Sequence, residues 1–227
     1  MHANLPRAVV FDLDGTLVDS APDLHAAVSR LLGEIGLAPI SLAQVTSFIG
    51  EGIPPLVANC LSAAGRPAKG TALDIAVTRY KALYAEAPAA LTRPYPGVPA
   101  CLRFLQKSDV KLGICTNKSE PLARDVLDGL SLTTLFPVIV GGDTLPVRKP
   151  DPEPLLHTVR ALGVEADETV YVGDSEIDAA TAKAAGIRFA LFTRGYRKAA
   201  IDMLPHDVSF DEFADLNVVL AALGQQS

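Results

Sequence analysis

The chain has 227 residues, and its 20 lysines and arginines against 26 aspartates and glutamates give a formal net charge of −6. With 49% hydrophobic and 20% charged residues it has the composition of a globular protein, which excludes a disordered or fibrous chain. The acidic balance without clustered cations argues against nucleic acid as the main ligand, and no apolar run approaches the roughly 18 residues of a membrane helix.

The predicted elements begin with a short buried strand, the apolar run at residues 7–11. No convincing strand lies between residues 18 and 86, where helical spacing occurs in the segments 23–36, 41–48, 54–64 and 72–87. The connector at residues 92–97 is rich in proline and suits a hinge. We therefore predict a helical cap domain at residues 18–87, inserted into a core domain of residues 1–17 and 88–227.

Strand and helix patterns alternate through the rest of the chain. Four apolar runs are typical of buried strands, at residues 110–116, 138–140, 169–173 and 188–192. Helical segments lie at residues 98–106, 120–130, 152–162, 176–185 and 213–223. This alternation predicts an α/β fold, a Rossmann-like parallel sheet with helices on both faces.

Polar side chains follow these predicted strands at their carboxyl ends, where open parallel sheets bind ligands. They are Asp12 and Asp14, Thr116 to Lys118, Lys149 after a loop, and Asp174 with Asp178 four residues later. Since Asp12 and Asp14 are two residues apart, an extended backbone points both to the same side. The alternation of elements alone thus predicts that carboxylates, a lysine and small hydrogen-bonding residues converge on one rim.

These motifs resemble those of the haloacid dehalogenase superfamily. Residues 12–16 (Asp-Leu-Asp-Gly-Thr) resemble its first motif, and Thr116-Asn117 its second. Lys149 is similar to the third motif, and residues 173–178 (Gly-Asp-Ser-x-x-Asp) to the fourth. The stretch 12–23 looks more narrowly like the phosphoglycolate phosphatases. Four motifs in order, each at a strand end, make a specific signal that covers essentially the whole chain.

The resemblance implies a phosphatase with a covalent mechanism. Asp12 would attack phosphorus and form an aspartyl-phosphate that water then hydrolyses. Asp14 would protonate the leaving oxygen and later deprotonate the attacking water. Thr116 and nearby backbone N–H groups would hold the phosphoryl oxygens, and Lys149 would neutralise the phosphate and keep Asp12 ionised.

The resemblance also implies a Mg²⁺ cofactor, because several carboxylates beside a phosphate repel one another unless a divalent cation is present. Asp12 and Asp174 would coordinate the ion through their carboxylates, and Asp14 through its backbone carbonyl. Asp178 would act indirectly, by holding a metal-bound water or the lysine.

The loop between the second and third predicted helices places Gly50 and Gly52 around Glu51. The small helical caps of the family carry specificity loops in this position, so we expect these three residues to contact the substrate; the alternative is an ordinary turn. Asn117 either binds the substrate or shapes its loop. Lys118 either binds a substrate anion or is a solvated lysine.

The predicted substrate is a small phosphorylated metabolite, most closely 2-phosphoglycolate. Residues 18–85 carry five acidic and five basic side chains, so the cap has no cationic stripe for a nucleotide or phosphopeptide. A β-phosphoglucomutase-like phosphotransferase and another small-molecule phosphatase are alternatives. A non-catalytic binding protein on the same fold is an alternative of a different class, which the intact motifs disfavour.

Three scattered cysteines, Cys60, Cys101 and Cys115, form no CxxC pair, a pattern typical of reduced thiols rather than of a disulfide framework or zinc site. The first apolar run is interrupted by Asp12 and Asp14, so no signal peptide is predicted. We therefore expect a cytoplasmic protein without membrane or nucleic-acid partners, present as a monomer or a weak homo-oligomer.

Overall fold

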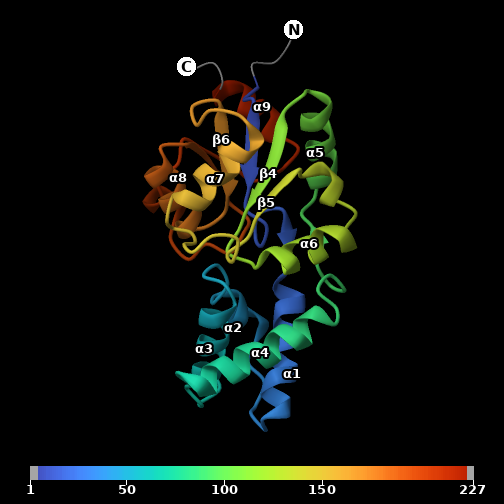
Figure 1. Cartoon of the computed structure of the whole chain (residues 1–227), viewed down its shortest axis with the longest axis vertical. Coiled ribbons are helices and arrows are strands. Elements are labelled where there is room, and N and C mark those ends of the chain that lie inside the picture. Colours follow the sequence, from blue (N-terminus) through green and yellow to red (C-terminus); the bar gives the residue numbers. More distant parts are fainter. Residues whose placement is uncertain (1–4, 224–227) are drawn as a thin grey trace.

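Six parallel strands form the main sheet of this computed structural model, which describes residues 5–223 (Figure 1). The strands in chain order are β1 (Ala8–Phe11), β4 (Lys111–Cys115), β5 (Val138–Val140), β6 (Thr169–Gly173), β7 (Arg188–Phe192) and β8 (Val208–Phe210). Their order across the sheet is β5-β4-β1-β6-β7-β8, so β1 lies between β4 and β6. Because every pair is parallel, all six carboxyl ends meet at one edge of the sheet.

Both faces of the sheet are covered by helices. Val9 and Phe11 of β1 contribute to the core that includes residues of α5 (Val98–Lys107), α6 (Glu120–Gly129) and α9 (Leu216–Leu223). Ala8 and Val10 contribute to the opposite core, with α7 (Glu153–Leu162) and α8 (Glu176–Ala185). Successive side chains of a strand point to opposite faces of the sheet. Because an apolar core covers each face, every position of β1 carries an apolar residue. The predicted fold class is confirmed.

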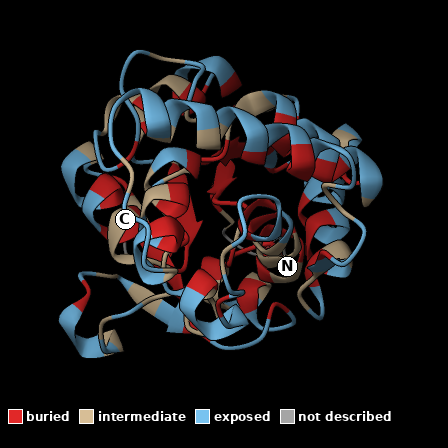
Figure 2. Cartoon of the chain, turned by 90° about the horizontal axis from the view of Figure 1, so that it is seen from below, coloured by how far each residue is buried: buried red, intermediate tan, exposed pale blue. Residues whose placement is uncertain are grey.

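Four helices form a separate helical unit below the carboxyl edge of the sheet (Figure 1). They are α1 (Ala21–Glu34), α2 (Leu42–Thr46), α3 (Ile53–Ala63) and α4 (Thr71–Ala85). Their buried side chains form a third apolar cluster, which Leu122 of α6 joins. In the view from below, buried residues gather in the interior and exposed residues on the outer surface (Figure 2).

A short antiparallel strand pair joins the two chain segments that cross between the helical unit and the sheet. It pairs β2 (Val18–Asp19) with β3 (Arg93–Pro94). The expectation that no strand lies between residues 18 and 86 is therefore wrong for β2. A strand of two residues is too short to show the alternation of apolar and polar side chains by which strands are predicted. Asp23 of α1 adds to this junction by accepting hydrogen bonds from the backbone N–H of Leu91 and from both the N–H and hydroxyl of Thr92.

Each apolar cluster contains one of the free cysteines. Cys101 lies in the core on one face of the sheet, Cys115 in the core on the other, and Cys60 in the core of the helical unit. All three are buried.

Within residues 5–223, no helix combines the length and apolar character that crossing a membrane requires.

Candidate active site

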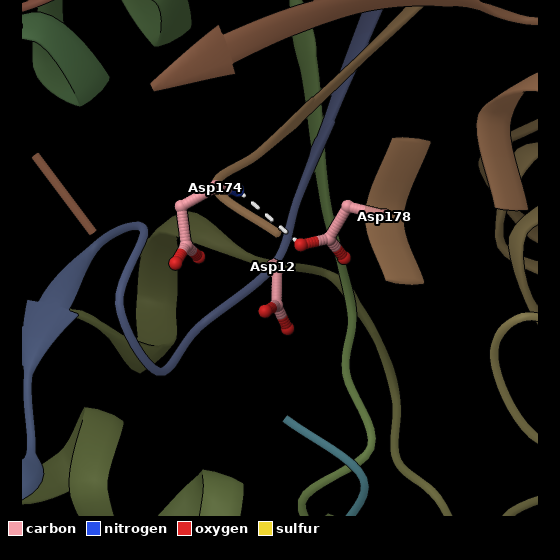
Figure 3. A group of neighbouring side chains, drawn as sticks. All are labelled: Asp12, Asp174 and Asp178. Atoms are coloured by element: carbon pink, nitrogen blue, oxygen red, sulfur yellow. Dashed lines mark hydrogen bonds between the residues drawn. The ribbon is translucent and has the colours of Figure 1, made fainter. Parts of the chain in front are cut away.

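The carboxyl edge of the sheet brings three acidic side chains together, as predicted from the strand ends. Asp12 follows β1, Asp174 follows β6, and Asp178 lies in the first turn of α8 (Figure 3). One carboxylate oxygen from each lies within 4.8 Å of the others. All three residues are buried, and the N–H of Asp174 donates a 3.2 Å hydrogen bond to Asp178 Oδ2. Three carboxylates are therefore close enough to hold a single metal ion.

Lys149 lies between two of these carboxylates. Its Nζ is 3.0 Å from Asp12 Oδ1 and 2.7 Å from Asp178 Oδ1. Burial opposes the ammonium charge, but Asp12 and Asp178 outweigh it and raise the pKa of Lys149 above its ordinary value. Burial raises the pKa of Asp12 to about 6, although Lys149 opposes this rise. The site therefore holds a permanent cation beside a carboxylate that ionises near neutral pH.

The carboxylate of Asp178 is held by five donors. Oδ1 accepts from Lys149 Nζ and from the Tyr171 hydroxyl, each at 2.7 Å. Oδ2 accepts from the N–H of Asp174 and from the N–H and hydroxyl of Ser175, which caps α8. Burial works against ionisation, but Lys149 and these hydrogen bonds hold the pKa of Asp178 below its ordinary value. With its oxygens occupied, Asp178 is suited to fixing Lys149.

The loop after β1 and the loop after β7 enclose Asp174. Its Oδ1 accepts a 2.6 Å hydrogen bond from the Thr16 hydroxyl, and its Oδ2 a 2.6 Å hydrogen bond from the N–H of Tyr196. A Cβ atom on Gly15, whose φ is +89°, would lie 2.6 Å from Asp174 Oδ2, and one on Gly195 would lie 2.3 Å away. Both glycines are therefore required for the backbone to approach this carboxylate.

The acidic cluster fits a divalent cation. Lys149 pairs with two of the three carboxylates, Asp12 and Asp178. Burial together with the charges of Asp178 and Asp12 raises the pKa of Asp174 well above its ordinary value. Asp12 Oδ1 is buried and accepts no hydrogen bond of good geometry from the described residues. Carboxylate oxygens are the ligands that Mg²⁺ prefers, and a cation would neutralise the charge that now favours protonation. Each oxygen of Asp174 accepts one hydrogen bond whereas Asp178 accepts five in all, so Asp12 and Asp174 retain the greater capacity to bind a cation.

A small cavity of about 40 Å³ lies between the sheet edge and the helical unit. Asp12, Asp14 and the segment Thr116–Lys118 line it from the sheet edge, and the helical unit contributes Leu24, Ile49, Gly50, Gly52, Ile53 and Leu56. Lys118 is buried, and its Nζ lies 3.0 Å from Asp14 Oδ2. The alternative of a solvated lysine at position 118 is therefore wrong.

Asn117 links the predicted specificity loop to the sheet edge. Its side-chain amide donates 3.0 Å hydrogen bonds to the carbonyl oxygens of Gly50 and Lys149. Asn117 also lines the cavity, so the loop-shaping contact is present and substrate binding by this residue stays a prediction. Gly50 and Gly52 line the cavity with φ values of +123° and +89°, whereas Glu51 between them is exposed and is not among the described residues that line it.

Sequence reasoning missed three residues that position the site and gave no role to a fourth, Thr16 of the first motif. Thr16 and Tyr196 hold Asp174, Tyr171 holds Asp178, and the ring of Tyr84 lies beside Lys118 with its centroid 4.7 Å from Nζ. Of the three that were missed, Tyr171 alone carried a signal, since a phenolic hydroxyl in a buried strand needs a partner. The other contacts join segments as much as 158 residues apart, which no local pattern reveals.

Comparison with known proteins finds relatives along nearly the whole chain. The family model described as haloacid dehalogenase-like hydrolase matches residues 9–192. A phosphoglycolate phosphatase of Cereibacter sphaeroides is 51% identical over 211 residues, covering 92% of this chain and 96% of the relative. A phosphoglycolate phosphatase of Rhodospirillum rubrum is 45% identical over 216 residues, 93% of this chain and 90% of its own.

A solved structure has a closely similar fold. The crystal structure of a predicted phosphoglycolate phosphatase from Haemophilus somnus matches with a TM-score of 0.88 at 29% identity. The match covers 94% of this chain and 97% of the other. The architecture of sheet and helical unit is therefore shared along almost the full length of both proteins.

Proposed function

This chain belongs to the haloacid dehalogenase-like hydrolases. We propose that it is a Mg²⁺-dependent phosphatase that hydrolyses 2-phosphoglycolate to glycolate and phosphate. The observation that carries the proposal is the buried set of Asp12, Lys149 and Asp174 next to a small cavity. Relatives with the name phosphoglycolate phosphatase, up to 51% identical, support the choice of substrate.

Asp12 is the nucleophile in this mechanism. One of its carboxylate oxygens attacks phosphorus, the bond between phosphorus and the glycolate oxygen breaks, and the phosphoryl group becomes covalently attached to Asp12. Water then attacks the same phosphorus, which releases phosphate and restores the carboxylate. Lys149, 3.0 Å from Asp12, favours the ionised nucleophile, and Asp178 fixes that lysine.

Asp14 is the acid and then the base. It lines the cavity, where it gives a proton to the departing glycolate oxygen and later takes one from the attacking water. Thr116 lines the same cavity from the end of β4 and holds a phosphoryl oxygen through its hydroxyl.

Asp12 and Asp174, with the backbone carbonyl of Asp14, would hold the Mg²⁺ ion. When bound, the ion supplies positive charge against the phosphoryl oxygens, the main requirement of phosphoryl transfer. Thr16 and Tyr196 orient Asp174 for this purpose, each through a 2.6 Å hydrogen bond.

The helical residues 18–87 act as a cap that selects a small leaving group and excludes water. The cavity of about 40 Å³ has room for only a few water molecules, and we infer that the cap moves to admit substrate. The two chain segments that connect the cap to the core pair with each other as β2 and β3, and this strand pair is the proposed hinge. Gly50 and Gly52 bring their backbone to the leaving group, and Glu51, which is exposed in this arrangement, reaches the substrate only if the cap moves. We place the enzyme in the cytoplasm, as a monomer or weak homo-oligomer.

Phosphate release measured with and without Mg²⁺ tests this function. We expect kcat/KM to be higher for 2-phosphoglycolate than for hexose phosphates or nucleotides, and activity to be lost in a chelator. A better hexose phosphate substrate, or isomerisation of β-glucose 1-phosphate, would contradict the proposed substrate. Hydrolysis that persists after the metal is removed would contradict the proposed cofactor.

A further inference from the structure

The ammonium group of Lys118 is a buried cation in the wall of the cavity. Its side chain is 3% exposed, and Nζ lies 3.1 and 3.0 Å from the two carboxylate oxygens of Asp14. Among the described residues, Asp14 is its only ion-pair partner. An ammonium has three N–H donors. The hydrogen bonds to Asp14 and the contact with Tyr84 hold this ammonium where it borders the space open to a ligand, so a ligand carboxylate can share its N–H donors with Asp14.

Tyr84 holds this ammonium in place from the helical unit. The ring centroid lies 4.7 Å from Lys118 Nζ, within the range of a cation–π contact. Tyr84 stands in the last turn of α4, stacks on Tyr80 with centroids 6.1 Å apart, and donates a 3.2 Å hydrogen bond to the carbonyl of Pro88. The ring is thus fixed on both sides, so it limits where the ammonium can lie.

The surroundings of Lys118 favour an anionic ligand. Leu24, Ile53 and Leu56 line the cavity with aliphatic side chains, which compete for no hydrogen bond. A cation in such surroundings gains from each added partner of opposite charge, because little water remains to solvate it. Lys118 lies beside Asp14, the residue that acts on the leaving oxygen in the proposed mechanism. A ligand anion here would belong to the leaving group.

We propose that Lys118, positioned by Tyr84, recognises a carboxylate on the leaving-group side of the substrate. The inference rests on the proposed function and names its substrate class as phosphate monoesters of 2-hydroxy carboxylates. The competing view is that Lys118 serves only as the counter-ion of Asp14. A counter-ion role affects every substrate alike, whereas recognition affects only substrates with the carboxylate.

A matched pair of substrates separates the two views. 2-Hydroxyethyl phosphate replaces the carboxylate of 2-phosphoglycolate with a neutral hydroxymethyl group and leaves the phosphate ester unchanged. We expect Lys118→Met, which keeps the length of the chain, to lose about 30-fold more kcat/KM for 2-phosphoglycolate than for 2-hydroxyethyl phosphate. Equal losses for the two substrates would overturn the recognition role.

Variants of Tyr84 test the positioning role. We expect Tyr84→Leu to raise KM for 2-phosphoglycolate roughly 5- to 20-fold with a much smaller change in kcat, since a cation–π contact is lost. KM for 2-hydroxyethyl phosphate should change less than about twofold by the same argument. Tyr84→Phe retains the ring face and should restore the wild-type KM. If Tyr84→Phe is as impaired as Tyr84→Leu, or both substrates suffer alike, the positioning role is wrong.

Failure of this inference can be told from failure of the proposed function. A wild-type enzyme that hydrolyses both substrates equally well contradicts recognition while the phosphatase stands. If it hydrolyses neither, the proposed function fails, and calorimetric titration with glycolate still decides the inference. Weaker glycolate binding to Lys118→Met than to wild type supports it, and equal binding contradicts it.

Discussion

Nζ of Lys149 lies 3.0 Å from Oδ1 of Asp12, so a buried ion pair joins the residue after β1 to the loop before α7. Neither partner is free to be solvated, and removing one leaves the other as a buried, less compensated charge. The reactivity of Asp12 and the stability of this sheet edge are therefore linked, and variants at the site must be judged by both measurements.

Asp12→Asn should abolish turnover without unfolding the protein. The amide is nearly isosteric but a very poor nucleophile, so we expect kcat to fall by several orders of magnitude. The folded pKa of Asp12, about 6, lies above the ordinary value of 3.8, so metal-free stability falls as pH rises through that window. Urea unfolding at pH 7.5 with a chelator checks that the variant stays folded: loss of the buried charge of Asp12 favours folding, and the less compensated charge of Lys149 opposes it. Near-wild-type hydrolysis would rule out the covalent mechanism.

Asp14→Asn should impair substrates according to their leaving group. Alkyl phosphates depart only with a proton, whereas an activated aryl phosphate departs readily without one. We expect a much larger loss of kcat for 2-phosphoglycolate than for p-nitrophenyl phosphate. Asp74→Asn, a change at an exposed position of α4, is the control and should leave both rates unchanged. Equal losses for the two substrates in Asp14→Asn would count against the acid–base role.

Mg²⁺ affinity should depend on pH through the two carboxylates proposed to bind the ion. Burial raises the pKa of Asp12 to about 6 and that of Asp174 well above its ordinary value, so protons compete with the metal as pH falls. Below pH 6 the Kd should rise about tenfold per pH unit for each proton displaced. Titration calorimetry between pH 5 and 8 measures this slope, with circular dichroism to verify folding. A Kd independent of pH would exclude these carboxylates as the ligands.

Gly52→Val should impair catalysis through the backbone of the cavity loop. Gly52 has φ +89°, and a Cβ there would lie 3.2 Å from the carbonyl oxygen of Asn117. Gly65→Val is a matched control, because Gly65 has φ +80° but no atom within 4 Å of its Cβ position. Both variants carry backbone strain of about 1–3 kcal/mol. Only Gly52→Val should lower kcat/KM for 2-phosphoglycolate tenfold or more; similar activity in the two variants would refute a role for this loop.

The sheet and its helices were predictable because each buried strand is a continuous apolar run. β1 is apolar at every position since both of its faces are covered. β8 was missed because only Phe210 of its three residues is buried and the middle one is an exposed serine. The β2–β3 pair was missed because each strand has two residues, and their pairing depends on how two distant segments meet.

The site was predictable to the extent that its residues follow strand ends. Asp12, Thr116 and Asp174 meet because parallel strands share an edge, and Lys149 reaches them from a loop. The position of Lys118 was not predictable, since it depends on α4 of the helical unit placing a tyrosine ring beside it. Local spacing carries no information about such a contact.

Each of the three apolar cores holds one buried thiol, so the native chain contains its own set of chemical reporters. Burial raises the pKa of Cys60, Cys101 and Cys115 to about 12, and a thiol that is neither ionised nor accessible does not react with alkylating reagents. The alkylation rate at each cysteine therefore follows the opening of the core that surrounds it. Cys60 reports on the helical unit alone, while the other two report on the separate faces of the sheet.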